Sequence, residues 1–310
     1  MRYVAGIDGG QSSTLAVVVA EDGRIVGRGA AGPAAHVDEP PGSHTAADAV
    51  GVALAAALVA AGLAADAPLA AVRIGLSGWD QHFDGAAPTL RAGSVRMCHD
   101  ATIALAGAIP ARPAAVVIAG TGSVAYGEDA AGRGLRIGGW GYLFGDAGSA
   151  FAVARDALAA AMLTDDAGGR HPLGDAALAF YDRPDLRALA TAAIQGRLSR
   201  ATLAGFARVV FDAARLGDAD AAAIVDRAAD ALAELAATLL ARLGLDQPAP
   251  VAFIGGLLAN ADFRARVGER LGRLVPQAVV VEPLYEPAAG AALLAFDDAA
   301  LGRPARLAPA

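Results

Sequence analysis

The chain has 310 residues, 55% of them hydrophobic, and its formal net charge is −7 at pH 7. This length suffices to bury the core of one large domain or of two smaller ones. An acidic chain without a basic block lacks the positive surface that nucleic acids require, so nucleic acid is excluded as a partner. The single cysteine excludes an intrachain disulfide and a Cys-rich metal site within one chain. All 25 basic residues are arginine, which excludes the lysine-dependent P-loop, protein-kinase and pyridoxal chemistries.

The most apolar segment, residues 46–65, approaches the length of a membrane span, but it contains Asp48 and consists mainly of alanine. We therefore expect a packed helix, capped by Ser43 or Thr45 and ending near Gly62, and no membrane partner. The N-terminus leads directly into a strand-like run, which predicts no signal peptide and a cytoplasmic location.

In chain order the pattern predicts three consecutive strands followed by alternating helices and strands, and then the same succession again. The first set comprises strands at 3–8, 14–20, 24–29, 71–76 and 94–98, with helices at 44–61 and from 101. The second comprises strands at 115–119, 123–127, 134–138, 250–255 and 278–282, with helices at 149–163, several between 173 and 243, and others from 260 and 287. This repetition indicates an internally duplicated α/β fold.

The expected architecture is therefore two α/β lobes with a cleft between them. The proline-containing segment 108–113 must end a helix, so we place the division there. The lobes are then residues 1–108 and 109–286, and the helix at 287–298 is expected to join the first lobe.

Two of the predicted hairpins have tips rich in glycine and hydroxyl side chains, within GIDGGQSST (6–14) and IAGTGS (118–123). Glycine permits positive φ and close approach of the backbone, while successive amides and short hydroxyls donate hydrogen bonds to an anion. One such hairpin is commonly only a tight turn. Two at matching places in a duplicated chain predict a pair of phosphate sites facing each other across the cleft.

Two aspartates are candidates for chemistry beside these loops. Asp8 ends the first strand, where a carboxylate beside a phosphate needs a cation between them, and Mg²⁺ suits such a place; the alternative is a residue that only shapes the turn. Asp100 follows a short strand and starts a helix, so it can be a helix N-cap, a general base, or both. His99 and His82 are interpreted as structural or surface residues.

Two further glycine-rich segments are candidates for ligand contact. In residues 136–162, an aromatic and a carboxylate, Trp140 and Asp146, favour a polar sugar-like ligand; the alternative places Trp140 in the core beside a helix cap. In residues 251–263, a strand ends on two glycines, where the backbone can approach a nucleoside or simply pack closely.

These motifs, in this order, resemble those of the sugar-kinase, Hsp70 and actin superfamily. Within it they resemble the N-acetylglucosamine and glucosamine kinase branch, which is grouped with the BadF/BadG-type ATPases. The resemblance covers nearly the whole chain and rests on the two hairpins together with LSGWDQ (76–81), HDATIALAGA (99–108), GGWGYLFGDAGSAF (138–151), FIGGLLAN (253–260) and EPAAGAALLA (286–295).

The resemblance implies a two-lobed actin-like ATPase (ribonuclease H-like) fold, ATP and Mg²⁺ as cofactors, and an amino sugar as substrate. It implies in-line attack by a sugar hydroxyl, O6 in this branch, on the γ-phosphate, with Asp100 as the base and Asp8 at the metal. A homodimer is a family-level expectation. ATP contacts would fall on Gly9, Gly10, Gln11, Ser12, Ser13, Thr14, Gly120, Thr121, Gly122, Ser123, Gly255 and Gly256, and sugar contacts on Gly78, Asp80, Gly139, Trp140, Gly141 and Asp146.

The sequence departs from this branch on the sugar side. Related N-acetylglucosamine kinases often have Asn where this chain has Val124, Glu where it has Ala147, and Asn in the loop that here reads PAAHV (33–37). Glucosamine, N-acetylglucosamine and a less common amino sugar are all open as acceptors.

Other functions in the same superfamily are the alternatives. Activators of 2-hydroxyacyl-CoA dehydratases share a [4Fe-4S] cluster between two subunits, each supplying two cysteines, and this chain has only Cys98. A different non-kinase ATPase of the BadF/BadG type, or a catalytically silent regulator that binds sugar or nucleotide, remains as the alternative reading.

Overall fold

The computed structural model describes residues 1–34, 40–79, 85–245 and 248–309. The chain divides into two compact units. Unit 1 comprises Met1–Val116, Ala130–Gly132 and Glu282–Ala310, and unit 2 comprises Val117–Asp129 and Arg133–Val281. The first break, between Val116 and Val117, lies within a strand, a few residues after the proline-containing segment 108–113. The C-terminal helix belongs to unit 1.

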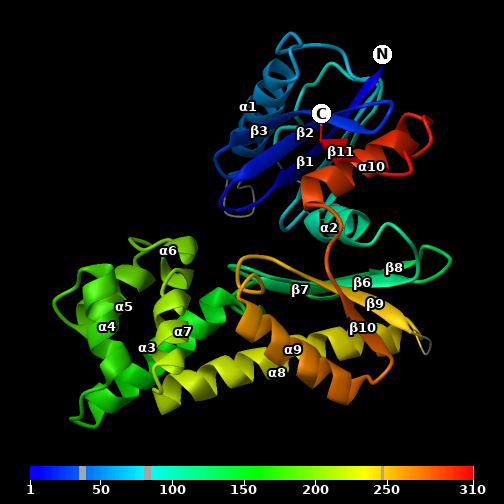
Figure 1. The fold of residues 1–310 in the computed structure, drawn as a ribbon. Helices are drawn as coiled ribbons and strands as arrows, with labels where there is room; N and C mark the ends of the chain where they lie inside the picture. The colour runs from blue at the N-terminus through cyan, green and yellow to red at the C-terminus, as the bar shows by residue number, and fades with distance from the viewer. Residues whose placement is uncertain (35–39, 80–84, 246–247, 310) are drawn as a thin grey trace. The chain divides into compact units, whose positions relative to one another are not determined.

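Unit 1 is built on a six-stranded sheet with the order β11-β3-β2-β1-β4-β5 (Figure 1). Strands β1, β2 and β3 form an antiparallel meander, whereas β4 is parallel to β1 and β5 is parallel to β4. The strands are β1 (Tyr3–Gly9), β2 (Thr14–Ala20), β3 (Arg24–Ala31), β4 (Ala71–Leu76), β5 (Val95–His99) and β11 (Ala308–Pro309).

Helices cover both faces of this sheet, as alternation along β1 requires. Ala5 and Ile7 pack in the same core as helix α1 (Thr45–Ala60). Val4 packs against helix α10 (Pro287–Asp298), and a Cβ on Gly6 would lie 2.1 Å from the carbonyl oxygen of Ala288 in α10. Asp8 follows Val4 and Gly6 at the same spacing of two residues, so its side chain lies on the face covered by α10. Helix α2 (Asp100–Ala108) packs beside α10 (Figure 1).

The start of α1 corrects one detail of the sequence analysis. His44 is the N-cap residue and makes no side-chain capping bond. Ser43, one of the two expected caps, instead accepts a hydrogen bond from the amide of Thr45, at 3.2 Å.

Unit 2 contains a five-stranded sheet with the order β10-β9-β6-β7-β8. This is the strand order of β5-β4-β1-β2-β3 in unit 1, so the predicted duplicated α/β fold is confirmed. The strands are β6 (Ala114–Ala119), β7 (Ser123–Glu128), β8 (Gly134–Gly138), β9 (Ala249–Ile254) and β10 (Ala278–Val281).

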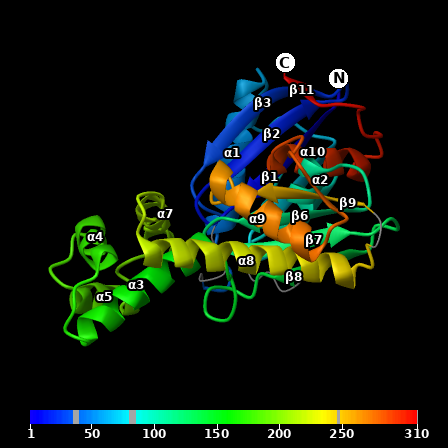
Figure 2. The same cartoon turned by 60° about the horizontal axis from the view of Figure 1, so that its bottom comes forward.

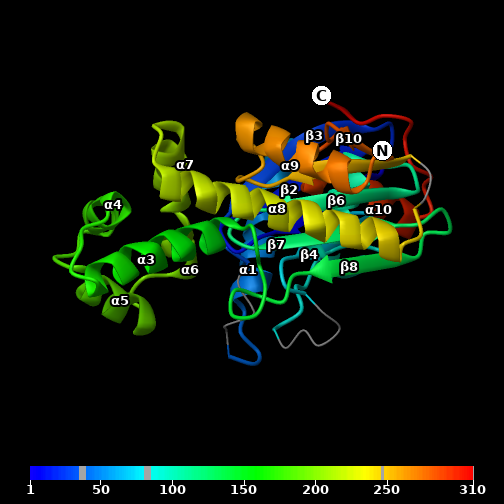
Figure 3. The same ribbon diagram turned by 90° about the horizontal axis from the view of Figure 1, so that it is seen from below.

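The remaining helices belong to unit 2. Helix α8 contacts β7 and β8 along one side and α9 along another (Figures 2 and 3). Helices α4 and α5 lie away from the sheet of this unit (Figure 2). The helices are α3 (Ala150–Asp166), α4 (Pro172–Tyr181), α5 (Leu186–Ile194), α6 (Arg200–Ala204), α7 (Ala207–Arg215), α8 (Ala219–Arg242) and α9 (Ala261–Leu274). Within the described parts of the chain, no helix has both the length and the apolarity to cross a bilayer.

Candidate functional site

The first predicted phosphate loop, residues 9–14 (loop 1), is the turn between β1 and β2. The amide of Gly10 donates to the carbonyl of Ser13 at 2.9 Å, which closes the turn. Ser12 and Ser13 are exposed, and among the described residues neither their amides nor their hydroxyls have a hydrogen-bond partner. These adjacent free donors are the groups that an anion would use.

The two ends of loop 1 have structural roles instead. The hydroxyl of Thr14 is fully buried and donates to the carbonyl of Gly32 at 2.8 Å. The carbonyl of Gly9 accepts from the amide of Ser77 at 2.9 Å, and a Cβ on Gly9 would lie 2.4 Å from the side chain of Leu76. Contact with a ligand through the Thr14 hydroxyl would therefore require breaking a buried hydrogen bond.

Asp8 precedes loop 1, and no described residue donates a hydrogen bond to its carboxylate or forms an ion pair with it. Burial, followed by the negative charges of Asp100 and Glu286, raises the pKa of the Asp8 carboxyl to about 7. An isolated carboxylate in this position is costly unless a cation compensates it. The described residues contain no group of three metal-ligating side chains, but Mg²⁺ commonly takes one or two carboxylates and fills its shell with water and phosphate oxygens. Asp8 therefore fits the magnesium that the sequence predicts.

Asp100 is the first residue of α2, and the N-cap is His99, whose Nδ1 accepts from the amide of Ala101 at 3.1 Å. The interpretation of Asp100 as an N-cap is thus wrong, and His99 has that structural role. The hydroxyl of Ser77 donates to Oδ2 of Asp100 at 2.5 Å, and Nδ1 of His99 lies 2.7 Å from Oδ1. Burial alone would raise the pKa of Asp100, but the hydrogen bond and charge of His99 and the hydrogen bonds of Ser77 and the Ala101 amide hold this pKa below its usual range. Asp100 is therefore a largely buried carboxylate whose contacts favour its ionised form.

The segment after β4 carries two predicted sugar contacts. Gly78 has φ +76°, so the turn itself requires glycine there. Asp80 and His82 lie outside the described residues. Ser77, one position before Gly78, was not predicted as a site residue.

The second predicted phosphate loop, residues 120–123 (loop 2), joins β6 to β7 and lies against the start of α3. The amide of Gly120 donates to the carbonyl of Gly122, and the amide of Ala150 in α3 donates to the carbonyl of Gly120, both at 2.9 Å. Among the described residues, the amides of Thr121 and Gly122 have no partner. Loop 2 therefore repeats the feature of loop 1: two adjacent amides free to bind an anion.

Asp146, predicted to bind sugar, is buried next to loop 2. Its Oδ1 accepts from the amide of Ser123 at 3.3 Å, and its Oδ2 forms an ion pair with the guanidinium of Arg200. The hydroxyl of Ser123 donates to the carbonyl of Ala147 at 2.8 Å. The Asp146 carboxylate therefore ties loop 2 to α6 through Arg200.

The loop between β8 and α3 displays its aromatic residues. Trp140 is 75% exposed and Phe144 is 89% exposed, so the alternative that placed Trp140 in the core is wrong. Gly139 and Gly141 have φ values of +69° and +80°, so the local backbone already requires glycine at both positions. Tyr142 packs 5.3 Å from the guanidinium carbon of Arg200, measured to the ring centroid. The exposed indole remains available to a ligand.

The two glycines after β9 differ in whether the local structure requires glycine there. Gly255 has φ +106°, and a Cβ there would lie 2.4 Å from the carbonyl oxygen of Ala119; close packing explains it. Gly256 and Gly120 have ordinary φ values, and a Cβ on either would meet no atom within 4 Å. Neither packing nor backbone conformation in the described structure requires glycine at these two positions, which is expected where a ligand approaches the backbone.

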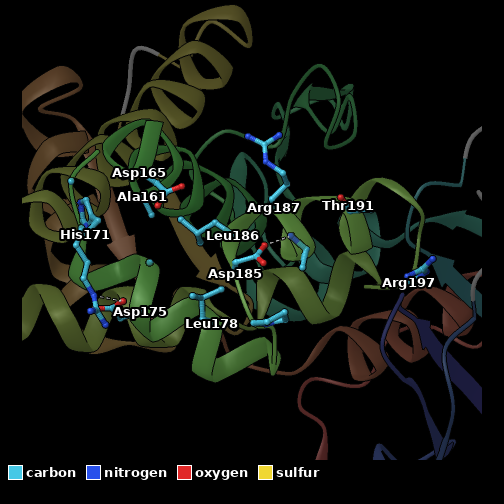
Figure 4. A pocket seen from close by; sticks show the side chains of 15 residues that line it. Ala161, Asp165, His171, Asp175, Leu178, Asp185, Leu186, Arg187, Thr191 and Arg197 are labelled. Atoms are coloured by element: carbon cyan, nitrogen blue, oxygen red, sulfur yellow. Dashed lines mark hydrogen bonds and ion pairs between the residues drawn. The ribbon is translucent and has the colours of Figure 1, made fainter. Parts of the chain in front are cut away.

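A cavity of about 920 Å³ lies elsewhere in unit 2, among α3, α4 and α5 (Figure 4). Its lining includes His171, Asp175, Arg187, Thr191 and Arg197. It contains none of the predicted site residues.

Three residues near the predicted site were missed: Ser77, Arg200 and Glu286. Ser77 lies in the motif LSGWDQ, and its hydroxyl at the end of a strand was the feature of the sequence that could have identified it. Glu286 forms an ion pair with Arg28 and precedes Pro287, which signals only a helix start. Arg200 lies 54 residues from its partner Asp146, and no sequence pattern connects the two.

A model of the BadF/BadG/BcrA/BcrD ATPase family matches residues 5–295 of the chain. Among solved structures, a candidate N-acetylglucosamine kinase from Chromobacterium violaceum is 30% identical and superposes with a TM-score of 0.78, covering 95% of this chain and 99% of that one.

Curated relatives match over shorter stretches. An N-acetylmuramic acid/N-acetylglucosamine kinase from Clostridium acetobutylicum is 36% identical over 41% of this chain and 42% of its own length. An N-acetyl-D-glucosamine kinase from Dictyostelium discoideum is 26% identical over 59% of each chain. The matched regions thus span less than two thirds of either curated relative.

Proposed function

Because the chain belongs to the BadF/BadG/BcrA/BcrD ATPase family, we propose that it is a kinase that transfers the γ-phosphate of ATP to a hydroxyl of an amino sugar. The observation that carries this proposal is the state of Asp100. Its carboxylate is largely buried, accepts from the Ser77 hydroxyl and has a pKa held below its usual range, and it belongs to the same unit as a loop with free amides and hydroxyls.

Asp100 is the general base in this proposal. As the sugar oxygen attacks the γ-phosphorus, the carboxylate accepts the hydroxyl proton, while the bond from phosphorus to the bridging oxygen of ADP breaks. Phosphoryl transfer requires little covalent chemistry from the protein, so positioning and charge stabilisation account for most of the rate. Ser77 contributes by fixing the orientation of the base through its 2.5 Å hydrogen bond.

The phosphates of ATP are assigned to the free donors of loop 1 and loop 2. Ser12 and Ser13 supply amides and hydroxyls in unit 1, and Thr121 and Gly122 supply amides in unit 2. Backbone donors of this kind serve in place of the lysine that the chain lacks. Gly256, exposed and without a packing reason to be glycine, is assigned to the nucleoside.

Asp8 is the residue that would hold Mg²⁺. The bound ion would neutralise phosphate charge during transfer. In its absence, the high pKa of Asp8 keeps this carboxyl partly protonated near neutral pH, which limits repulsion between Asp8, Asp100 and an incoming polyphosphate.

The acceptor is assigned to the amino sugars because the family relatives are named for N-acetylglucosamine and N-acetylmuramic acid. Trp140, which is 75% exposed, is assigned to packing against a face of the sugar. Asp146 is already paired with Arg200, so in this proposal the ion pair as a whole, rather than a free carboxylate, presents hydrogen-bonding groups to the sugar. Attack through O6 is part of the proposal.

The test is an ADP-release assay with Mg·ATP and a panel of N-acetylglucosamine, glucosamine, N-acetylmuramic acid, N-acetylmannosamine and glucose. We expect one or more amino sugars to stimulate ADP release well above glucose, and the product to carry a phosphate at O6 by NMR. Release of ADP that no sugar stimulates would overturn the kinase proposal in favour of a non-kinase ATPase. Nucleotide binding without any turnover would favour a silent regulator.

A further inference from the structure

His99 makes two contacts through one atom. Its Nδ1 lies 3.1 Å from the amide nitrogen of Ala101, which it caps, and 2.7 Å from Oδ1 of Asp100. The His99 side chain is only 16% exposed and that of Asp100 only 21%. The imidazole next to the proposed base is therefore held in place and largely shielded from water.

The 2.7 Å contact constrains where a proton lies. A bare Nδ1 and an ionised carboxylate oxygen would present lone pairs to each other at this distance, which is repulsive. Oδ1 of Asp100 is also buried, and among the described residues it has no partner in hydrogen-bond geometry, His99 included, so its desolvation is uncompensated unless the imidazole turns an Nδ1–H toward it. An ionised Asp100 thus requires a proton on Nδ1.

The helix cap has the opposite requirement. To accept from the Ala101 amide, Nδ1 must present a lone pair. The cap is therefore compatible with a protonated Asp100 and competes with an ionised one. Donation to a buried carboxylate is the stronger of the two hydrogen bonds, because a charged partner roughly doubles the contribution.

We infer that His99 is a positioning residue for Asp100: its Nδ1–H donates to Oδ1 and, together with the Ser77 hydroxyl at Oδ2, holds the carboxylate ionised and in one orientation. Oδ1 is sealed from solvent, so Oδ2, which also accepts from Ser77, is the oxygen left to take the hydroxyl proton in the proposed reaction. The inference rests on the proposed function for the role of Asp100 as base, whereas the His99–Asp100 pair itself can be tested without any substrate.

The substitutions His99→Asn and His99→Asp form a matched pair. Both place a short planar group at the position of the imidazole Nδ1, and both are favourable N-caps. Only asparagine can donate a hydrogen bond to Asp100, whereas aspartate presents a second negative charge. Equal kcat in the two variants would mean that His99 acts only as a cap, whereas a loss in His99→Asp can also come from its added charge, so the protonation of Nδ1 decides between the two. If it positions the base, we expect His99→Asn to stay within about threefold of the parent and His99→Asp to lose at least about tenfold more in kcat, with KM for ATP unchanged.

Nitrogen NMR of the imidazoles supplies a readout independent of activity, and it remains valid if His99→Asp folds poorly. The chain has 5 histidines, so the His99 resonance can be assigned by its loss in His99→Asn. We expect Nδ1 to be protonated in the parent protein and to become a bare acceptor in Asp100→Asn, as the ring returns to capping Ala101.

The outcomes separate this inference from the proposed function. A bare Nδ1 in the parent protein, or equal kcat in the matched pair, overturns the inference. A protonated Nδ1 that responds to Asp100→Asn, in a protein that phosphorylates no sugar, supports the pair and overturns the proposed function instead.

Discussion

Asp8 in unit 1 and Asp146 in unit 2 each lie beside a glycine-rich hairpin loop, yet only Asp146 has a cationic partner. Asp146 is neutralised by Arg200 and accepts from the Ser123 amide. Asp8 has no donor among the described residues, and its pKa is raised to about 7. The same duplicated hairpin thus has two electrostatic settings. The comparison is consistent with the proposal that a cation binds and a proton is transferred in unit 1, whereas the Asp146 carboxylate of unit 2 is already held in an ion pair.

The sharpest test of this division is Asp100→Asn, which removes the proposed base from unit 1 while keeping its shape. General-base catalysis contributes about 10²- to 10⁴-fold, so we expect kcat to fall by that factor with nucleotide affinity retained. Sugar-stimulated ADP release and ATP titration by calorimetry measure the two effects. The control is Glu234→Gln on the exposed face of α8, which should change neither. An active Asp100→Asn enzyme would contradict the assignment of the base.

In unit 2 the corresponding change is Arg200→Ala, which leaves the buried Asp146 carboxylate unpaired. Breaking a buried ion pair in this way costs roughly 3–5 kcal/mol of unfolding free energy, and chemical denaturation measures it. Adding Asp146→Asn should recover part of the loss, because the buried charge is then gone. Arg155→Ala, which removes an ion pair with about half-exposed partners, should cost less than about 1 kcal/mol. Equal effects of the two arginine substitutions would remove the structural distinction drawn for Asp146.

Asp8 gives the stability of unit 1 a pH dependence. Its folded-state pKa of about 7 lies above its ordinary value of 3.8, so the folded state binds the proton more tightly than the unfolded state does. The penalty for ionised Asp8 is absent below about pH 4, grows as the pH rises, and is complete above about pH 7. The difference in pKa corresponds to on the order of 4 kcal/mol.

Asp8→Asn should therefore be more stable than the parent protein at pH 8, and the two should converge near pH 4. Added Mg²⁺ should stabilise the parent at pH 8, and chelation should reverse the effect, while Asp8→Asn should respond to neither. Thermal unfolding across pH, with and without Mg²⁺, measures both effects. Parallel stability curves for the two proteins would mean that Asp8 is not the buried, unpaired carboxylate described here.

The smallest expected effect separates ligand-facing glycines from packing glycines in unit 2. Gly120→Ala adds a methyl group that meets no atom within 4 Å, so stability should change by less than about 1 kcal/mol. ATP affinity should fall about tenfold, equivalent to about 1.4 kcal/mol, if a phosphate approaches there. Gly255→Ala should instead lower the melting temperature, because its φ of +106° and its contact with Ala119 exclude a Cβ. Unchanged ATP affinity in Gly120→Ala would remove loop 2 from the nucleotide site.

Much of the fold followed from local sequence patterns. Alternating apolar runs and glycine-bearing turns predicted the strands on both sides of the duplication, and the strand orders of the two sheets agree with it. Both hairpin loops were found because the same combination of glycine and hydroxyl residues occurs at matching places in the duplicated chain. Asp8 and Asp100 were chosen because each is a carboxylate at the end of a strand.

What the sequence could not decide was the partner of each polar group, because partners come from distant segments. Arg200 pairs with Asp146 across 54 residues, and the charge of Glu286 acts on Asp8 in a fold where Gly6 lets α10 pack directly on β1. Tertiary contacts also determine whether a hydroxyl is buried and hydrogen-bonded, as in Thr14, or free, as in Ser12.

The sequence by itself therefore determined the duplicated α/β framework and the places where backbone donors and carboxylates emerge from it. Only the tertiary structure decided that Trp140 is exposed, that His99 rather than Asp100 occupies the N-cap position of α2, and that one loop-side carboxylate is neutralised while the other is not. The physical reason is that periodicity and turn chemistry act over a few residues, whereas burial and charge depend on which remote side chains the packing brings within a few ångströms.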